Sequence, residues 1–434
     1  MKPISLYPLC SLALAIAFAA VPALGRADTY SCSNDLTNTI GSVVRTDDAG
    51  NVLDTFGEDV LVYPISVAFD RSGLLYVADF ALGRVYRFLP DGTFLDQFAE
   101  VNDLVSSIVF HPDGSLLVAR YEGETVWRFA SDGTPMGEFV SGNGLQRHGQ
   151  MAFDSSGNLY VCSWTDYAIL RYDIDGNPLG VWSDNSISGI NGVTGMVFDA
   201  FGQMIVSEYA TNALKLLDAN GFLVLELATT FGEPEYLTLE PDGTLLVPFF
   251  YDDTIHRYGS DGSDLGEFAA VQGSYQIEKG PPFFLPESFA RIRGRVDAGD
   301  VNSLSAVDGD SLRVCRFLVL NATEPPIQVN VQSTSPVLDP SSLTVHVTSR
   351  MATAGLFQQE VVMFDENGAQ SPTVRRSDTC SNTNSTVSLA ADVPPDFVDA
   401  DGRVQIRINV RQIGPSAALQ WCHETDQVIW VAVP

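Results

Sequence analysis

The sequence is poor in positive charge. Its 434 residues contain 24 lysines and arginines against 54 aspartates and glutamates, which gives a formal net charge of −30. The lysines are only Lys2, Lys215 and Lys279. Such a negative surface repels nucleic acids and anionic membranes, so the composition argues against both as partners.

Long apolar runs are missing after residue 27. Before that point, Lys2 precedes the apolar run 9–24, and small residues at 23–27 provide a cleavage site. This arrangement predicts a secretory signal peptide over residues 1–27. Cys10 lacks the small residues that a lipoprotein cleavage site needs before it, so no lipid anchor is predicted. We therefore expect a secreted or periplasmic protein without a membrane span.

The sequence has few cysteines and no CxxC spacing, so a zinc or thioredoxin-like site is not indicated. Five cysteines remain after the signal peptide, and with an odd number at least one stays unpaired or pairs between chains. The C-terminal third can form one bridge that involves Cys422, with its partner left open. Cys162 is expected to be a small buried apolar residue. The five are Cys32, Cys162, Cys315, Cys380 and Cys422.

What the sequence does contain is a repeat of about 42 residues. A hairpin glycine recurs at steps of 41, 43, 45 and 41 residues, at Gly73, Gly114, Gly157, Gly202 and Gly243. A second glycine follows each, at Gly92, Gly133, Gly176, Gly221 and Gly262. Four short alternating strands per unit at this period predict a β-propeller.

The ends of the repeat suggest how the ring closes. Residues 28–59 contain a half repeat that matches only a third and a fourth strand, so residues 272–293 are expected to supply the inner strands. Five full repeats and one shared repeat predict six blades, with five blades or a distorted closure as alternatives. The predicted propeller spans 28–279, and 280–293 is a linker or part of the ring closure.

Residues 294–434 contain further alternating runs without helical periodicity. About seven strands separated by turn residues predict an antiparallel β-sandwich. The complete chain is therefore expected to be all-β, with a propeller followed by a sandwich.

Two resemblances accompany these patterns. The run 64–88, PISVAFDRSGLLYVADFALGRVYRF, resembles an NHL repeat, although the later copies lose its strand-ending Asp at Arg120, Ser163 and Phe249. This resemblance implies a six-bladed propeller, a fold that includes protein binders, RNA binders, lyases and lactonases. Residues 294–434 resemble a β-sandwich module at the C-termini of secreted bacterial proteins, which implies location and architecture alone.

Equivalent positions of the blades form rings about the propeller axis, and two such rings are candidate sites. The first is aromatic in all five repeats and consists of Phe80, Tyr121, Trp164, Tyr209 and Phe250. The second precedes it and includes Asp79, Arg120, Ser163 and Glu208. Together they could bind a glycan or an extended peptide at the channel mouth. The alternative is that the aromatic side chains are core residues between blades.

The leading hypothesis is an exported, non-catalytic binding or scaffold protein whose propeller binds an extracellular glycan or protein. The alternative is a metal-dependent hydrolase or lyase, lactonase-like or lyase-like, with Asp79 and Glu208 sharing calcium or magnesium near His148. His111 and His256 are expected at the surface. No cofactor is predicted for the binding protein, and bound calcium is left open for the loop with Asp297, Asp300, Asp308 and Asp310.

Overall fold

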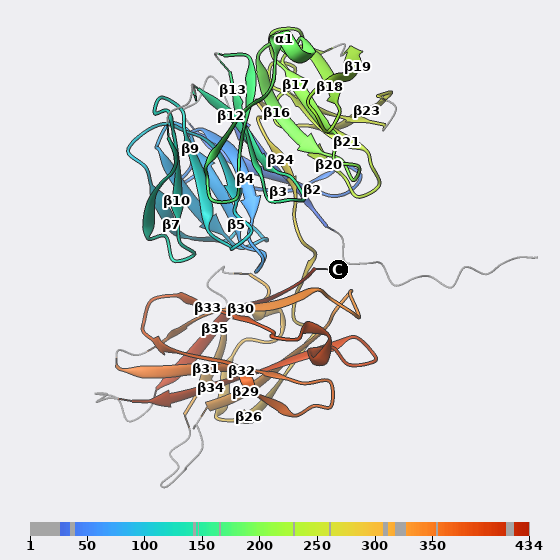
Figure 1. The fold of residues 1–434 in the computed structure, drawn as a ribbon. Coiled ribbons are helices and arrows are strands. Elements are labelled where there is room, and N and C mark those ends of the chain that lie inside the picture. Colours follow the sequence, from blue (N-terminus) through green and yellow to red (C-terminus); the bar gives the residue numbers. More distant parts are fainter. Residues whose placement is uncertain are drawn as a thin grey trace, which may run out of the picture.

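The computed structural model describes residues 27–34, 40–141, 145, 147–164, 166–228, 231–259, 262–306, 311–316, 327–352, 355–413 and 421–433. All but the last residue of the predicted signal peptide therefore lies outside the described residues. Figure 1 shows two β-rich parts, a ring of sheets in blue to yellow above and a two-layered part in orange and red below.

Each of the five repeats forms one four-stranded antiparallel sheet, with its strands in sequence order. The strands are β4 (Pro64–Phe69), β5 (Leu75–Asp79), β6 (Arg84–Phe88), β7 (Phe94–Glu100), β8 (Val105–Phe110), β9 (Leu116–Arg120), β10 (Thr125–Phe129), β11 (Pro135–Ser141), β12 (His148–Phe153), β13 (Leu159–Ser163), β14 (Ala168–Tyr172), β15 (Pro178–Asp184), β16 (Val193–Phe198), β17 (Met204–Glu208), β18 (Ala213–Leu217), β19 (Leu223–Ala228), β20 (Thr238–Leu239), β21 (Leu245–Phe249), β22 (Thr254–Tyr258) and β23 (Asp264–Ala270). A single turn of helix, α1 (Asn185–Ser188), joins β15 to β16.

The repeated glycines occupy the turns that the sequence assigned to them. In the first hairpin, Gly73 has a φ of 82°, a conformation that costs glycine little and other residues more. Asp70 supports the same turn, because its Oδ1 atom accepts hydrogen bonds from the main-chain N–H groups of Ser72 and Leu74. The period in the sequence therefore reflects a turn that each blade repeats.

One further four-stranded sheet closes the ring, in the order β24 (Ile277–Lys279), β1 (Thr29–Asn34), β2 (Gly41–Thr46) and β3 (Val52–Phe56). The prediction that residues 28–59 hold only two strands is wrong, because β1 precedes them. Only the innermost strand, β24, comes from the far end, and Thr29 pairs with Lys279. The innermost strands β4, β8, β12, β16, β20 and β24 contact one another in sequence, and β24 contacts β4 again. The sheets therefore form a closed propeller.

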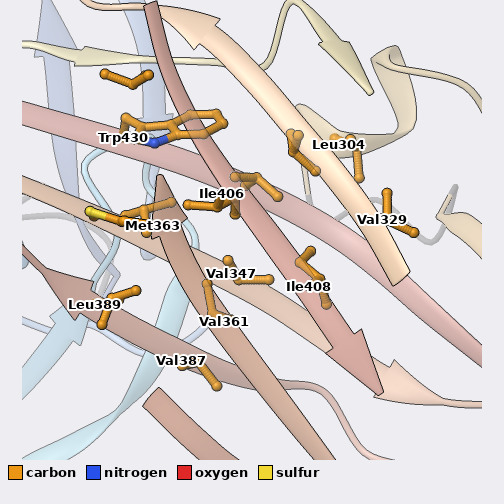
Figure 2. Close-up of a cluster of buried hydrophobic side chains, with 14 of the residues drawn as sticks. Leu304, Val329, Val347, Val361, Met363, Val387, Leu389, Ile406, Ile408 and Trp430 are labelled. Atoms are coloured by element: carbon orange, nitrogen blue, oxygen red, sulfur yellow. The ribbon is translucent and has the colours of Figure 1, made fainter. Parts of the chain in front are cut away.

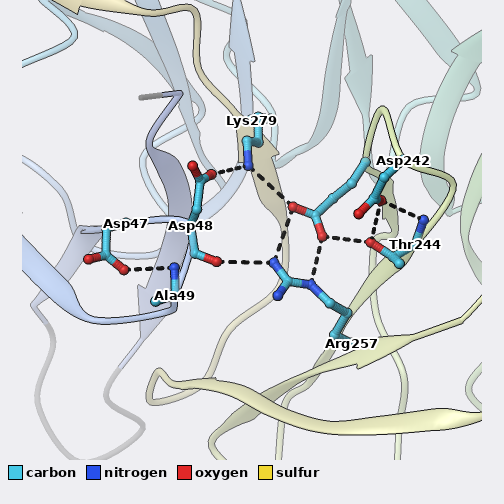
Figure 3. Close-up of polar contacts among 8 residues, drawn as sticks. Asp47, Asp48, Ala49, Asp242, Thr244, Arg257 and Lys279 are labelled. Carbon is cyan, nitrogen blue, oxygen red and sulfur yellow. Dashed lines mark hydrogen bonds and ion pairs between the residues drawn. The ribbon is translucent and has the colours of Figure 1, made fainter. Parts of the chain in front are cut away.

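Ion pairs join the closing sheet to the last repeat, as Figure 3 shows. Glu240, which follows β20, accepts a hydrogen bond from Arg257 Nε at 2.7 Å and pairs with Lys279 Nζ at 3.2 Å. Lys279 also pairs with Asp48 of the closing sheet. The two ends of the ring are thus connected by charged side chains as well as by strand pairing.

The C-terminal part is a β-sandwich of two antiparallel sheets. One contains β27 (Arg295–Ala298), β28 (Leu312–Cys315), β35 (Cys422–Val433), β30 (Ser342–Met351) and β33 (Ser385–Ala390), with β25 (Phe283–Phe284) also paired to β35. The other contains β26 (Ser288–Arg293), β29 (Ile327–Thr334), β34 (Arg403–Gln412), β31 (Phe357–Phe364) and β32 (Gln370–Cys380). Two short 3₁₀ helices, Asn302–Leu304 and Pro394–Phe397, lie in the connections. The predicted all-β fold class is confirmed.

Apolar side chains from both sheets meet between them, as Figure 2 shows for Val347 and Trp430 of one sheet and Val361 and Ile406 of the other. Residues 280–293 are not a simple linker, because β25 and β26 pair with β35 and β29 of the sandwich. The predicted bridge at Cys422 is confirmed, and its partner is Cys315.

The sandwich packs against the propeller through β35. Ile429 and Val431 belong to one apolar cluster with residues of the first two repeats, such as Tyr76. His346 Nε2 also lies 2.9 Å from the main-chain oxygen of Ser72, in the turn between β4 and β5. The sandwich therefore covers the face of the propeller at which the first strands end, and within the described part of the chain the opposite face is uncovered.

Candidate ligand-binding cup

The uncovered face of the propeller contains a cavity of about 460 Å³. It lies where the innermost strands begin and the second strands end. We call this cavity the cup. It is lined by Tyr63, Ile65, Phe80, Ala81, Ser106, Tyr121, Arg147, His148, Gly149, Trp164, Thr194, Tyr209, Glu233, Glu235, Tyr236, Phe250, Tyr251 and Tyr275.

Aromatic rings follow one another around the cup. Their centroids lie 4.5 Å apart for Phe250 and Tyr275, 5.7 Å for Tyr275 and Tyr63, and 5.3 Å for Phe80 and Tyr121. These separations are typical of favourable aromatic contacts. We call this set the aromatic rim, and it consists of Tyr63, Phe80, Tyr121, Trp164, Tyr209, Phe250, Tyr251 and Tyr275.

A repeated hydrogen bond places one rim residue in each repeat. The residue after the second strand donates its main-chain N–H to a carbonyl of the segment that leads into the first strand. The pairs are Phe80 with Tyr63, Tyr121 with Leu104, Trp164 with Arg147, Tyr209 with Gly192 and Phe250 with Glu233, at 2.7 to 3.4 Å. All five aromatic residues singled out in the sequence therefore lie on the wall of the cup, and their rings also touch neighbouring blades.

The second predicted ring does not line the cup. Asp79 Oδ2 accepts hydrogen bonds from the main-chain N–H groups of Val62 and Tyr63 at 2.6 and 3.0 Å. Glu208, fully buried, pairs with Lys215 at 2.9 Å. Successive residues of a strand point in opposite directions, so the residue before each rim aromatic is directed into the blades. These residues hold loops in place.

The remaining two members of that ring are also engaged away from the cup. Arg120 Nη2 lies 3.0 Å from Asp103 Oδ2, and Ser163 Oγ donates to Asp166 Oδ2 at 3.1 Å. The grouping of Asp79, Arg120, Ser163 and Glu208 as a mixed ligand ring is therefore wrong.

The predicted shared cation at Asp79 and Glu208 does not fit the structure. Each carboxylate is engaged within its own sheet, Asp79 by main-chain N–H groups and Glu208 by Lys215. Across the described residues, no three histidine, cysteine, aspartate or glutamate side chains gather as a metal site. For the calcium prediction in the sandwich, Asp308 and Asp310 lie outside the described residues, and Asp297 pairs with Arg295 at 2.6 Å.

Sequence reasoning missed Glu235, the most unusual group in the cup. This side chain is 5% exposed and its carboxyl has no hydrogen-bond partner among the described residues. Burial, with a smaller contribution from Glu233, raises the pKa of Glu235 well above its usual value. The corresponding residues of the other repeats are Ile65, Ser106, Gly149 and Thr194. A single acidic residue in that otherwise uncharged ring was the signal that could have identified it.

His148 lies on the cup wall, as the alternative hypothesis required. Its Nδ1 lies 2.8 Å from the main-chain oxygen of Arg120, so Nδ1 carries the proton that it donates. Its Nε2 is buried and has no hydrogen-bond partner among the described residues. Burial lowers the pKa of His148 to about 4, which keeps the ring neutral at physiological pH. Nε2 is therefore a free proton acceptor directed at buried space.

The other two propeller histidines are not at the surface, contrary to expectation. His111 lies 2.7 Å from Asp113 and 2.9 Å from the carbonyl of Ile174 in the next blade. His256 lies 3.1 Å from Asp264. Both rings are buried and hold turns or adjacent strands together.

Polar side chains close the channel beneath the cup. Gln276 Oε1 accepts hydrogen bonds from Ser66 Oγ at 2.7 Å and from the N–H of Val67 at 3.2 Å. Gln150 Oε1 accepts one from the N–H of Met196 at 2.8 Å. These bonds connect neighbouring blades, and Gln150 Nε2 donates a further bond to the carbonyl of Leu237, two blades away, at 3.3 Å. Side chains therefore bridge the centre beneath the cup, which is a depression rather than an open pore.

These features define a β-propeller with a closed channel and an aromatic-lined cup on its uncovered face. No protein-family model matches the chain, and no curated protein matches it. Solved structures do match. The propeller of a nidogen/laminin complex has a TM-score of 0.50 at 16% identity, over 58% of this chain and 97% of that one.

Two further solved structures are similar over comparable shares of the chain. A protein of unknown function from Bacteroides caccae has a TM-score of 0.47 at 14% identity, over 58% of this chain and 98% of that one. An inactive variant of virginiamycin B lyase from Staphylococcus aureus, solved with quinupristin, has a TM-score of 0.44 at 13% identity, over 57% of this chain and 86% of that one. At such identities the similarity concerns the fold alone.

Proposed function

We propose that this chain is an exported binding protein whose six-bladed, NHL-like propeller receives the end of a glycan or a protruding segment of another protein in its cup. The observation that carries the proposal is a cup-shaped cavity of about 460 Å³ whose wall is an almost continuous series of aromatic rings. This volume lies within the range of ligand pockets. Aromatic faces offer stacking surfaces for sugar rings and for apolar side chains.

Export is supported by the N-terminal segment and by cysteine chemistry. Residues 1–27 have the pattern of a signal peptide, and the sandwich contains the bridge between Cys315 and Cys422, which suits an oxidising compartment. Within the described part of the chain, no helix has the length and apolar character needed to cross a membrane. We place the protein in the periplasm or outside the cell, with residues 28–279 and 283–433 as its two domains.

Trp164 offers a direct test of binding, because its indole is part of the cup wall. Purified protein is screened against an array of glycans and peptides, and each hit is titrated by intrinsic fluorescence. We expect Trp164→Ala to weaken binding of the hit at least about tenfold, as for loss of a central aromatic contact. Phe201→Ala is the control, because Phe201 is exposed in a turn away from the cup. Unchanged affinity of the Trp164 variant would contradict the proposal.

Proton-transfer catalysis in the same cup is the second candidate, and His148 favours it. His148 lies on the cup wall as a neutral imidazole, and its Nε2, which has no partner among the described residues, can accept a proton from a bound substrate once a side-chain movement exposes this buried atom to the cup. The test is turnover of lactones and uronate-containing sugars by the wild type and by His148→Gln. Turnover that the variant loses, while it still binds the substrate, would establish the enzyme and overturn the non-catalytic proposal.

A further inference from the structure

The Glu235 carboxyl is buried among tyrosines whose hydroxyls are occupied elsewhere. The hydroxyls of Tyr63 and Tyr275 lie 3.1 Å apart and bond to each other. The hydroxyl of Tyr236 donates to the carbonyl of Ser106. Burial of a carboxyl without a hydrogen bond is costly, and Glu235 lines the cup, so a ligand group that enters the cup can satisfy it.

The surroundings of Glu235 favour a positively charged partner. The π-face of an aromatic ring attracts cations, and the attraction is strongest where water is excluded. The ring of Tyr275 contacts the rings of Tyr63 and Phe250, with centroids 5.7 and 4.5 Å apart, and all three residues line the same cavity as Glu235. Burial raises the pKa values of Tyr63, Tyr236 and Tyr275. The chain's net charge of −30 adds a long-range attraction for cations.

Arg147, the positively charged residue of the cup wall, lies in a different repeat from Glu235. Arg147 precedes β12 and is positioned over the rings of Tyr121 and Trp164, 5.7 and 6.0 Å from their centroids. Glu233 and Glu235 precede β20, and the repeat β16 to β19 lies between the two groups. The cup is therefore asymmetric, with its arginine and its acidic residues in different repeats.

We propose that the cup recognises an ammonium group, protonated or quaternary, that sits against Glu235 and is enclosed by Tyr63, Phe250 and Tyr275. This inference rests on the proposed binding function and specifies the chemistry of the ligand. An ammonium group satisfies the carboxylate by charge and the rings by cation–π contact. Neither interaction is available to an uncharged group of the same shape.

Binding of such a group is linked to release of a proton. Burial raises the pKa of Glu235, so without a ligand the carboxyl stays protonated at pH values at which an exposed glutamate is ionised. A bound cation favours the ionised carboxylate instead. The affinity for a permanent cation therefore rises with pH until Glu235 is ionised in the free protein. The other titratable and charged groups of the cup wall are Glu233, Tyr63, Tyr236 and Tyr275, whose pKa values burial also raises, neutral His148, and Tyr121, Arg147, Tyr209 and Tyr251.

The test compares choline with 3,3-dimethylbutanol, its uncharged analogue of the same shape, by calorimetry between pH 5 and 8. We expect choline to bind at least about tenfold more tightly, to gain affinity as pH rises, and to release a proton, seen in buffers of different ionisation enthalpy. Glu235→Gln should remove both the preference and the proton release. Glu267→Gln, at an exposed position of β23, is the control and should retain both.

The outcomes separate this inference from the proposed function. A glycan or peptide that binds and depends on Trp164, with no preference for choline over its analogue, would overturn the ammonium site alone. Failure of every probe to bind would overturn both proposals. Should Glu235→Gln fail to fold, proton release by the wild type still decides, because binding of choline without proton release contradicts a role for Glu235.

Discussion

The hydroxyl of Tyr236 donates a hydrogen bond to the main-chain carbonyl of Ser106 at 3.1 Å. Tyr236 lies two residues before β20, and Ser106 lies in β8. These two strands are opposite one another in the cycle of innermost strands, so a single side chain spans the centre of the ring. It forms part of the floor on which a ligand in the cup would rest.

Removal of that hydroxyl should loosen the centre of the propeller. We expect Tyr236→Phe to lower the free energy of unfolding by about 1 kcal/mol, since it leaves the buried Ser106 carbonyl without this donor. Urea unfolding followed by tryptophan fluorescence measures the change. Tyr251→Phe, at a rim residue that is 62% exposed, should stay within about 0.5 kcal/mol of the wild type. Equal effects would contradict the role of Tyr236.

The ion pairs at the ring closure should contribute more to the free energy of unfolding than ion pairs at the surface do. Glu240 is buried and faces both Arg257 and Lys279, so Glu240→Gln leaves two cations without their shared carboxylate. We expect a loss of about 2 kcal/mol in the free energy of unfolding. Glu100→Gln is the control, because Glu100 is half-exposed and pairs with Arg84 at 3.5 Å. That change should cost under about 1 kcal/mol.

Two equivalent hairpin glycines can isolate the contact between propeller and sandwich. A Cβ on Gly73 would lie 2.6 Å from Val431 Cγ1, whereas one on Gly114 would meet nothing within 4 Å. Both glycines have positive φ values, of 82° and 91°, so both alanine variants share a backbone cost of about 1 to 2 kcal/mol. We expect Gly73→Ala to lose about 1 to 3 kcal/mol more, through overpacking. Equal losses in urea unfolding would show that the sandwich does not press on this turn in solution.

His423 in the sandwich should lower the free energy of unfolding at acidic pH. Burial lowers the pKa of His423 to about 4, while the unfolded chain titrates near 6.5. Between these values the unfolded state binds more protons, so the free energy of unfolding falls as pH falls from about 6.5 to 4, by on the order of 3 kcal/mol. His423→Gln should remove this pH-dependent part of the free energy of unfolding. The glutamine keeps a donor for Gln359, which the imidazole contacts at 2.7 Å. The measurement is urea unfolding at pH 7.5 and pH 4.5, and an unchanged difference between the two would contradict it.

The repetitive part of the fold could be predicted because its turn chemistry is local. Glycines such as Gly73 and Gly243 mark a left-handed turn in each repeat, and alternation between them specifies strands. The closing sheet was predicted less well. Strand β1, TYSCSN, has no turn glycine before it, and it pairs with β2 on one side and with β24, some 250 residues away, on the other.

In the candidate site, too, features that repeat in every blade could be predicted and features that occur once could not. The rim residues Phe80, Tyr121 and Trp164 were found because they recur in register. The charged residues before them were misassigned, since strand alternation directs Asp79 and Glu208 into the blades. Glu235 was missed because a single substitution in a repeat carries no pattern, and its importance depends on the burial that the assembled ring creates.

The bridge between Cys315 and Cys422 closes a chain segment with a sequence separation of 107 residues. One end of that covalent loop is β35, the same strand whose Ile429 and Val431 pack against the propeller. A protease that cuts within residues 316–421 would therefore release no fragment until the disulfide is reduced. The last strand would stay joined to the body of the molecule, and the cup would keep its orientation after a cut that would otherwise divide the chain.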